Sequence, residues 1–336
     1  MQAYNRVRET TFMRETSMSR FTVNNDKVVR ICSCRLVVDR ASLIIWIAFV
    51  FLTYSATVEA VSDSDTAQGS IVLPTGELLF EVGNRFLRSV NLSTRESAEI
   101  ITVPPTSIAQ CPTVVKRSKT LVYLKNDVSS GSVIYCNPKA NSNETLWSGP
   151  VISFLDYNEA TEMFAYVRSG SLYVRSKGQP EIEKLVVDKN VRGPISWEPT
   201  GTELLYCTKE DEIVILNLRN SKTKVIDNGG WASVSPDGKS IAYRSGNEIR
   251  IFDRDNGTTK KLVETDLSFP EQTYDWGQLS WSPDGKWLAY AEGFPRLKNC
   301  EATIYLVNVE DGSRIESYKL ESCPIGPLLW WRYGDQ

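Results

Sequence analysis

The sequence predicts an all-β fold, a six-bladed β-propeller of four-stranded antiparallel blades, preceded by one hydrophobic N-terminal helix. Three observations lead to this prediction. A strand-and-turn motif recurs six times after residue 70, aromatic residues mark its copies at similar spacing, and one uncharged apolar segment stands apart near the N-terminus. Recurrence at about forty residues is typical of propellers, in which each blade is one small sheet.

The apolar segment at residues 41–60 divides the chain. Residues 41–58 carry no charge and follow a basic region, residues 1–40, which we expect to be disordered. This order is typical of a signal peptide cleaved after Ala60 or of a retained signal anchor, and a buried soluble helix is the remaining interpretation. Both membrane interpretations place everything after residue 60 outside the cytoplasm, in a periplasmic, extracellular or lumenal space, because basic flanks stay inside. Residues 61–69 are small and polar, which indicates a linker to a propeller at 70–336.

The repeat is clearest at residues 234–243 and 281–290, which share the letters Ser-Pro-Asp-Gly-Lys before an apolar strand that ends on tyrosine. Residues 197–206 form a third copy with Glu-Pro-Thr-Gly in the same place. Each of the six copies ends its strand on a marker aromatic, and these residues are Phe80, Tyr123, Tyr166, Tyr206, Tyr243 and Tyr290. The markers lie 37 to 47 residues apart, which is the period of four-stranded blades.

Each copy predicts four strands in order. An inner strand such as 279–281 meets a Pro-Asp-Gly turn, and a second strand such as 286–291 follows. A third strand such as 248–252 and a fourth such as 260–263 are joined by an Asn-Gly or Asp-Gly pair. Because Asp237 and Asp284 recur at equivalent turn positions, we interpret them as turn-forming residues.

The Ser-Pro-Asp-Gly-Lys core with its following strand resembles the TolB-type propeller repeat and is similar to the propeller domains of the prolyl oligopeptidase and dipeptidyl peptidase families. The resemblance is strong over residues 195–292 and weaker over 69–190. It implies a six-bladed ring that acts as a scaffold for protein partners. The hydrolase domain of the peptidase families is not expected here, since the sequence stops with the ring.

Ring closure is predicted to use both ends of the repeat region. Residues 328–331 resemble an opening strand and are predicted to insert as the inner strand of the first blade. Residues 71–76 also resemble an opening strand, so the two segments compete for that place, and a seven-bladed ring is the alternative.

Composition argues against most enzymes. The chain contains no histidine, which excludes a Ser-His-Asp or Cys-His nucleophile and any His-ligated metal site within it. Its 38 basic and 41 acidic residues leave a net charge of −3, so nothing favours a nucleic-acid partner. The exported part contains no P-loop, Gly-x-Ser-x-Gly elbow or Cys-x-x-Cys pair, and we expect no cofactor and no metal.

The cysteines suggest one disulfide. Cys300 and Cys323 fall at the open end of the last predicted hairpin and are expected to face each other, with two unpaired thiols as the alternative. Cys111 and Cys136 fall on the first and third strands of blade two, so a bridge between them needs a distorted loop. Cys207 is expected to be a buried apolar residue.

Three Asn-x-Ser/Thr triplets begin at Asn91, Asn143 and Asn256, each near the turn between third and fourth strands. Glycans there would line one rim of the ring. The alternative is that these residues are common turn formers and the triplets arise by composition.

Two sets of residues are candidate binding positions. The longest loop between second and third strands, residues 291–300, carries Phe294, Arg296 and Lys298, and long insertions in repeat proteins often mark the binding face. The second set is the inner-strand tryptophans, which either pack between blades or line a binding face, and these are Trp197, Trp231, Trp281 and Trp330.

The function predicted from the sequence is a non-catalytic, exported, monomeric propeller that binds a protein or peptide and touches the membrane only through its N-terminal segment. The alternative is a carbohydrate-binding or carbohydrate-active propeller with a histidine-free site at the channel mouth, and a purely structural ring is a third possibility. A cluster of channel side chains with perturbed pKa values would favour the enzyme.

Overall fold

The computed structural model describes residues 74–82, 85–265, 279–293, 302–320 and 328–332. The expected N-terminal region 1–40, the helix at 41–60 and the linker at 61–69 lie outside these ranges. Within the described ranges, no helix is long and apolar enough to span a bilayer.

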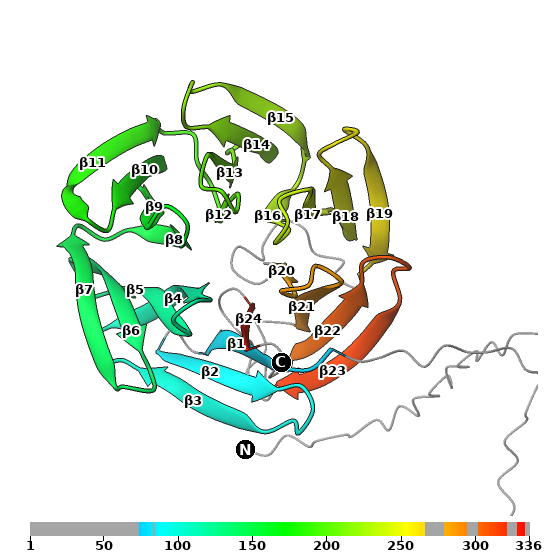
Figure 1. Ribbon diagram of the computed structural model, residues 1–336, viewed down its shortest axis with the longest axis horizontal. Helices are drawn as coiled ribbons and strands as arrows, with labels where there is room; N and C mark the ends of the chain where they lie inside the picture. The colour runs from blue at the N-terminus through cyan, green and yellow to red at the C-terminus, as the bar shows by residue number, and fades with distance from the viewer. Residues whose placement is uncertain (1–73, 83–84, 266–278, 294–301, 321–327, 333–336) are drawn as a thin grey trace, which may run out of the picture. The chain divides into compact units, whose positions relative to one another are not determined.

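The described chain folds into six four-stranded antiparallel sheets arranged as blades around a centre (Figure 1). Blade 1 contains β24 (Leu329–Arg332), β1 (Glu77–Val82), β2 (Phe86–Asn91) and β3 (Ser97–Thr102). Blade 2 contains β4 (Ile108–Val115), β5 (Thr120–Asn126), β6 (Gly131–Asn137) and β7 (Ser142–Gly149). Blade 3 contains β8 (Ser153–Asn158), β9 (Met163–Arg168), β10 (Ser171–Ser176) and β11 (Gln179–Val187).

The second half repeats the pattern. Blade 4 contains β12 (Ile195–Trp197), β13 (Glu203–Cys207), β14 (Glu212–Asn217) and β15 (Thr223–Asn228). Blade 5 contains β16 (Gly230–Val234), β17 (Ser240–Ser245), β18 (Glu248–Asp253) and β19 (Thr259–Glu264). Blade 6 contains β20 (Ser280–Trp281), β21 (Trp287–Gly293), β22 (Ala302–Asn308) and β23 (Arg314–Leu320). The prediction of a six-bladed propeller is confirmed, and the described strands include no seventh blade.

The ring closes through its C-terminal strand, as predicted. β24 is the inner strand of blade 1 and pairs antiparallel with β1, with Trp330 opposite Leu78 and Leu329 opposite Leu79. Of the competing segment 71–76, only residues 74–76 are described, and they are not part of a strand. Two segments far apart in sequence therefore share one sheet, which leaves the ring without an open blade.

The hydrophobic core consists of six clusters, one between each pair of neighbouring blades. All six marker aromatics lie on second strands and are no more than 6% exposed. Alternation of side chains along a strand sends one face of each sheet to each neighbour, so every blade is apolar on both faces.

The Pro-Asp-Gly turns are held by their own side chains. Asp237 Oδ1 accepts hydrogen bonds from Ser235 Oγ at 2.6 Å and from the Lys239 N–H at 3.1 Å. Asp284 Oδ1 repeats the pattern with Ser282 and Lys286. These contacts confirm the structural interpretation of both aspartates.

No disulfide joins Cys111 and Cys136, a pairing that the sequence left open. Cys136 packs in the cluster between blades 1 and 2, whereas Cys111 packs against the cluster between blades 2 and 3. Their side chains therefore leave opposite faces of one sheet, and β5 separates their strands. Cys207 is a buried thiol between blades 4 and 5, as expected. Cys300 and Cys323 lie outside the described residues.

Candidate functional site

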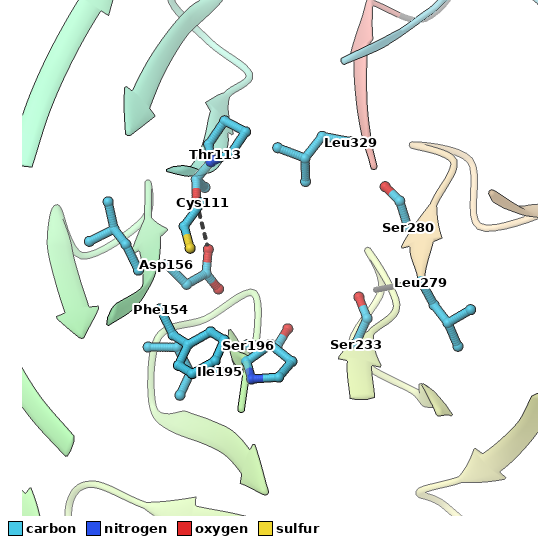
Figure 2. A pocket seen from close by; sticks show the side chains of 13 residues that line it. Cys111, Thr113, Phe154, Asp156, Ile195, Ser196, Ser233, Leu279, Ser280 and Leu329 are labelled. Atoms are coloured by element: carbon cyan, nitrogen blue, oxygen red, sulfur yellow. Dashed lines mark hydrogen bonds between the residues drawn. The ribbon is translucent and has the colours of Figure 1, made fainter. Parts of the chain in front are cut away.

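The centre of the ring contains a cavity of about 100 Å³ whose lining comes from the inner strands of all six blades (Figure 2). It offers several times the space that one buried water needs. Apolar side chains such as Phe154, Ile195 and Leu329 share the lining with hydroxyls and one carboxylate. A central channel to which every blade contributes is the candidate site.

Each blade places one lining residue at the same structural position. In every blade this residue pairs with the residue that precedes the marker aromatic on the second strand. We call these six residues the channel ring. They are Thr113, Asp156, Ser196, Ser233, Ser280 and Leu329. Four members carry hydroxyls and one is apolar, so Asp156 is the single charged member.

In three blades, a backbone bulge in the inner strand orients the channel-ring residue. Cys111, Phe154 and Trp231, each two residues before a ring position, have positive φ angles of 49°, 50° and 58°. The register of the inner strand shifts at each of these places. Positive φ is unfavourable for residues other than glycine, and bulges typically re-aim side chains beside functional sites.

The Asp156 carboxylate accepts three hydrogen bonds and connects three blades. Oδ2 accepts the backbone N–H of Trp197 in blade 4 at 2.8 Å. Oδ1 accepts the Tyr157 N–H at 2.9 Å and the Thr113 hydroxyl of blade 2 at 3.2 Å, and the latter bond is visible in Figure 2. The geometry keeps the carboxylate in one orientation at the channel wall.

Burial dominates the electrostatics of this carboxylate. Desolvation raises the pKa of Asp156 to about 6, although the hydrogen bonds from Trp197, Tyr157 and Thr113 act in the opposite direction. No arginine or lysine of the described residues forms an ion pair with it. At neutral pH the channel wall therefore holds one anion without a nearby cation from the described chain.

Three of the four candidate tryptophans form hydrogen bonds between neighbouring blades. The indole N–H of Trp197 donates to the Asp156 carbonyl at 3.2 Å, Trp281 to Ser233 at 3.0 Å and Trp330 to Ser280 at 3.1 Å. All three are at most 8% exposed. Each acceptor is a channel-ring residue of the preceding blade, so packing between blades is their role here. Trp231, the bulge residue of β16, is half-buried.

None of the remaining candidates is among the described residues that line the cavity. Phe294, Arg296 and Lys298 lie outside the described residues. Asn91 ends β2, Asn143 lies in β7 and Asn256 lies in the turn before β19, all near turns between third and fourth strands as expected. Asn91 and Asn256 also cap these turns through their side-chain oxygens, which is a structural use of the triplets.

No group of three or more histidine, cysteine, aspartate or glutamate side chains suited to a metal ion occurs among the residues that the structure describes. In the turn after β18, the carboxylate of Asp253 accepts hydrogen bonds from the Asp255 N–H and from the backbone and side chain of Asn256, which is a turn-forming role.

Sequence reasoning missed the channel ring although a signal for it exists. Counting ten residues back from a marker aromatic reaches Thr113, Asp156, Ser196, Ser233 and Ser280. Asp156 differs from the others in charge, which is visible in the sequence. The bulges were not visible, because neither cysteine, phenylalanine nor tryptophan is a usual residue for positive φ.

The fold and its channel define a class: a closed six-bladed β-propeller with a mixed polar and apolar channel. No protein-family model and no curated protein sequence matches the chain. Solved structures do resemble it. TolB from Acinetobacter baumannii matches with a TM-score of 0.62 at 14% identity, covering 76% of this chain and 66% of that one.

Two further structures agree. A putative TolB from Agrobacterium tumefaciens matches with a TM-score of 0.58 at 14% identity, covering 79% of this chain and 100% of that one. A chain of a nidogen/laminin complex matches with a TM-score of 0.60 at 10% identity, covering 75% and 97%. At these identities the similarity concerns the fold alone, and that fold is a TolB-like propeller.

Proposed function

We propose that this protein is an exported, non-catalytic propeller that binds a protein or peptide partner at its central channel. The observation that carries the proposal is the channel ring. It combines hydroxyls, an apolar residue and one carboxylate that accepts three hydrogen bonds from the protein, and its six members include no second carboxylate, lysine or arginine. Such a mixture suits recognition of a chain with both polar and apolar groups.

The neighbours are compatible with this proposal. One similar structure was solved as a nidogen/laminin complex, and two others are TolB structures. Export is proposed from the basic region and the apolar segment at 41–60. The loop with Phe294, Arg296 and Lys298 connects β21 to β22 and is proposed as a further contact segment for the partner.

No observation favours the carbohydrate-active alternative. Sugar binding commonly relies on exposed aromatic faces, but Trp197, Trp281 and Trp330 are buried between blades. The perturbed carboxylate of Asp156 is a single group, whereas glycoside hydrolysis needs two carboxylates about 5–9.5 Å apart.

The proposal is tested by selecting a random-peptide display library on the full-length chain and measuring the affinity of the enriched peptide. We expect binding in the micromolar range or tighter. Ser233→Trp fills the channel and should abolish binding, while Ser142→Trp, the same change on the exposed outer strand β7, should leave it intact. Equal binding by both variants, or enrichment of no peptide together with turnover of a glycan library, would contradict the proposal.

The N-terminal segment at residues 1–60, the expected disulfide and the glycosylation triplets are tested by a separate measurement. Mass spectrometry of the mature protein gives the N-terminus, the state of Cys300 and Cys323, and any glycan on Asn91, Asn143 or Asn256. Cleavage after Ala60 or an intact segment 41–60 in a membrane fraction would each support export. A cytoplasmic chain with its full N-terminus would contradict it.

A further inference from the structure

One feature of the channel is not explained by stability: the charge on Asp156. A half-buried carboxylate without an ion-pair partner among the described residues loses part of its hydration, and the channel wall solvates the anion less well than water does. The residue nevertheless occupies a ring position where the other five blades have neutral side chains.

The hydrogen bonding at this position does not require a charge. Asp156 joins blade 3 to blade 4 by accepting the Trp197 N–H. One blade further on, the hydroxyl of Ser196 accepts the Val234 N–H at 3.3 Å and makes the equivalent contact between blades 4 and 5. A serine hydroxyl therefore makes this one contact between neighbouring blades without a charge. The negative charge of Asp156 is available to a group that enters the channel.

The surroundings of Asp156 indicate the chemistry of that ligand. Phe154 places apolar surface beside the carboxylate, and Leu329 lies across the channel (Figure 2). The hydroxyls of Ser233 and Ser280 also line the cavity. A group with an aliphatic stem and a charged hydrogen-bond donor at its end fits this combination, because the stem contacts the apolar wall while the head meets the anion.

We propose that the carboxylate of Asp156 binds the ammonium end of an aliphatic cation, such as a lysine side chain or the N-terminus of a peptide, that enters the central channel. The ammonium head would also donate to channel-ring hydroxyls, and its stem would lie against Phe154 and Leu329. A metal ion is a poorer occupant, since the described residues provide no group of three or more ligands at this place. The inference rests on the proposed function and specifies what the partner presents to the channel.

The test uses n-butylammonium as the probe and 1-pentanol as its neutral counterpart, with affinities from ligand-observed NMR titration of the full-length chain at pH 7.5. Wild type should bind the ammonium in preference to the alcohol. Asp156→Asn should weaken ammonium binding roughly tenfold or more and leave the alcohol unaffected, as expected for loss of a charge-assisted hydrogen bond. Asp255→Asn makes the same change of charge in an exposed turn and should have no effect.

Binding should also weaken on acidification. Burial raises the pKa of Asp156 to about 6, so roughly a tenth of the carboxylate is ionised at pH 5 and the apparent affinity falls about tenfold from its value at pH 7.5. The other titratable side chain among the described lining residues is Cys111, and thiols ordinarily ionise near pH ~8.5, above this range. Asp156→Glu should recover part of the binding, whereas Asp156→Asn should bind with no pH dependence.

Several results would overturn the inference. One is that wild type and a folded Asp156→Asn variant bind the ammonium equally well. A second is that wild type shows no preference for the ammonium over the alcohol. A third is that millimolar Ca²⁺ displaces the probe from both proteins. Near-ultraviolet circular dichroism of the tryptophans establishes that the variant is folded. If the selected peptide binds Asp156→Asn as well as wild type, the inference fails and the proposed function stands. If the ammonium binds through Asp156 but no peptide is selected, the proposed function fails and the cation site stands.

Discussion

Blades 4 to 6 and blades 2 and 3 fold in the same way but are held together by different chemistry. In the first group, blades 5 and 6 share Ser-Pro-Asp-Gly turns that their own aspartates close, and buried indoles join neighbouring blades, as in the contact of Trp281 with Ser233. In the second group, ionised and amide side chains make the contacts. Glu159 of blade 3 accepts the N–H groups of Lys116 and Arg117 in blade 2, and Asn158 donates to the Glu198 carbonyl in blade 4.

An arginine and aromatic cluster strengthens this contrast at the junction of blades 2 and 3. Trp147, Tyr166 and Tyr173 stack in series, with ring centroids 5.3 and 5.7 Å apart. Arg175, which is 8% exposed, lies 5.2 Å from the Trp147 ring, and Glu183 forms ion pairs with Arg175 and Arg168. Burying an arginine is tolerable only because the carboxylate and the aromatic faces compensate its charge.

The contrast teaches how a repeat fold tolerates sequence divergence. Blades 5 and 6 keep the Ser-Pro-Asp-Gly motif, and the regular blades are joined by indole hydrogen bonds together with an ion pair between Arg254 and Glu203. Blades 2 and 3 lack the motif and are joined to their neighbours by carboxylate and amide contacts. Both groups bury the marker aromatic equally well. We therefore expect the two groups to respond differently to the following changes, given from the largest effect to the smallest.

Deleting residues 328–336 removes β24 and should open the ring. Trp330 and Trp331, which are 6% and 5% exposed, would leave two interblade clusters. At roughly 3–5 kcal/mol for each large aromatic, the loss exceeds about 5 kcal/mol and approaches the whole stability of a typical domain. Urea unfolding measures it, with deletion of 333–336 alone as control. Wild-type stability in the longer deletion would show that closure does not depend on β24.

Glu183→Gln should lower the free energy of unfolding by roughly 2–3 kcal/mol at the junction of blades 2 and 3, because Arg175 then keeps a buried charge without its carboxylate. Burial alone would raise the pKa of Glu183, but the hydrogen bonds from Arg168, Tyr166 and Arg175 lower it below the ordinary value. Its stabilisation is therefore present above the ordinary pKa of 4.5 and is lost as the pH falls below it.

Thermal unfolding at pH 7 tests this change. The control is Glu144→Gln, because its 3.9 Å ion pair with Lys177 is exposed and should contribute little. An equal effect of the two substitutions would mean that the buried ion pair does not stabilise the junction.

Asp156→Asn should remove a pH dependence of opposite sign. The folded pKa of about 6 lies above the ordinary 3.8, so the folded protein binds the proton more tightly and the contribution of Asp156 to stability decreases between pH 4 and 6. The change amounts to roughly 2 kcal/mol, less than the full pKa shift corresponds to, because the carboxylate is partly exposed to water in the channel. Denaturant unfolding of both proteins at pH 4.5 and 7 isolates it. Identical pH profiles would show that the carboxylate is not desolvated.

Trp281→Phe should have the smallest effect, about 1–2 kcal/mol, because it removes one hydrogen bond to Ser233 and part of the buried ring area. The loss should not vary between pH 5 and 7, unlike the effect of Asp156→Asn. Trp147→Phe is the matched control at a half-buried surface position that keeps its stacking on Tyr166. A greater loss in the control would reverse the distinction between the two groups of blades.

The sequence by itself determined the architecture of this protein. The six marker aromatics fixed the number of blades, and the likeness of residues 328–331 to an opening strand predicted the closing strand. These features are local or periodic: Pro-Asp-Gly turns and alternating apolar residues have the same conformational preferences wherever they occur.

Only the tertiary structure decided what lies at the centre. Asp156, Thr113 and the Trp197 N–H come from three blades about forty residues apart, and no local preference links them. The bulges at Cys111 and Phe154 and the opposite facing of Cys111 and Cys136 likewise follow from how sheets pack into a ring. Burial, which gives Asp156 its raised pKa, is a property of all six blades together.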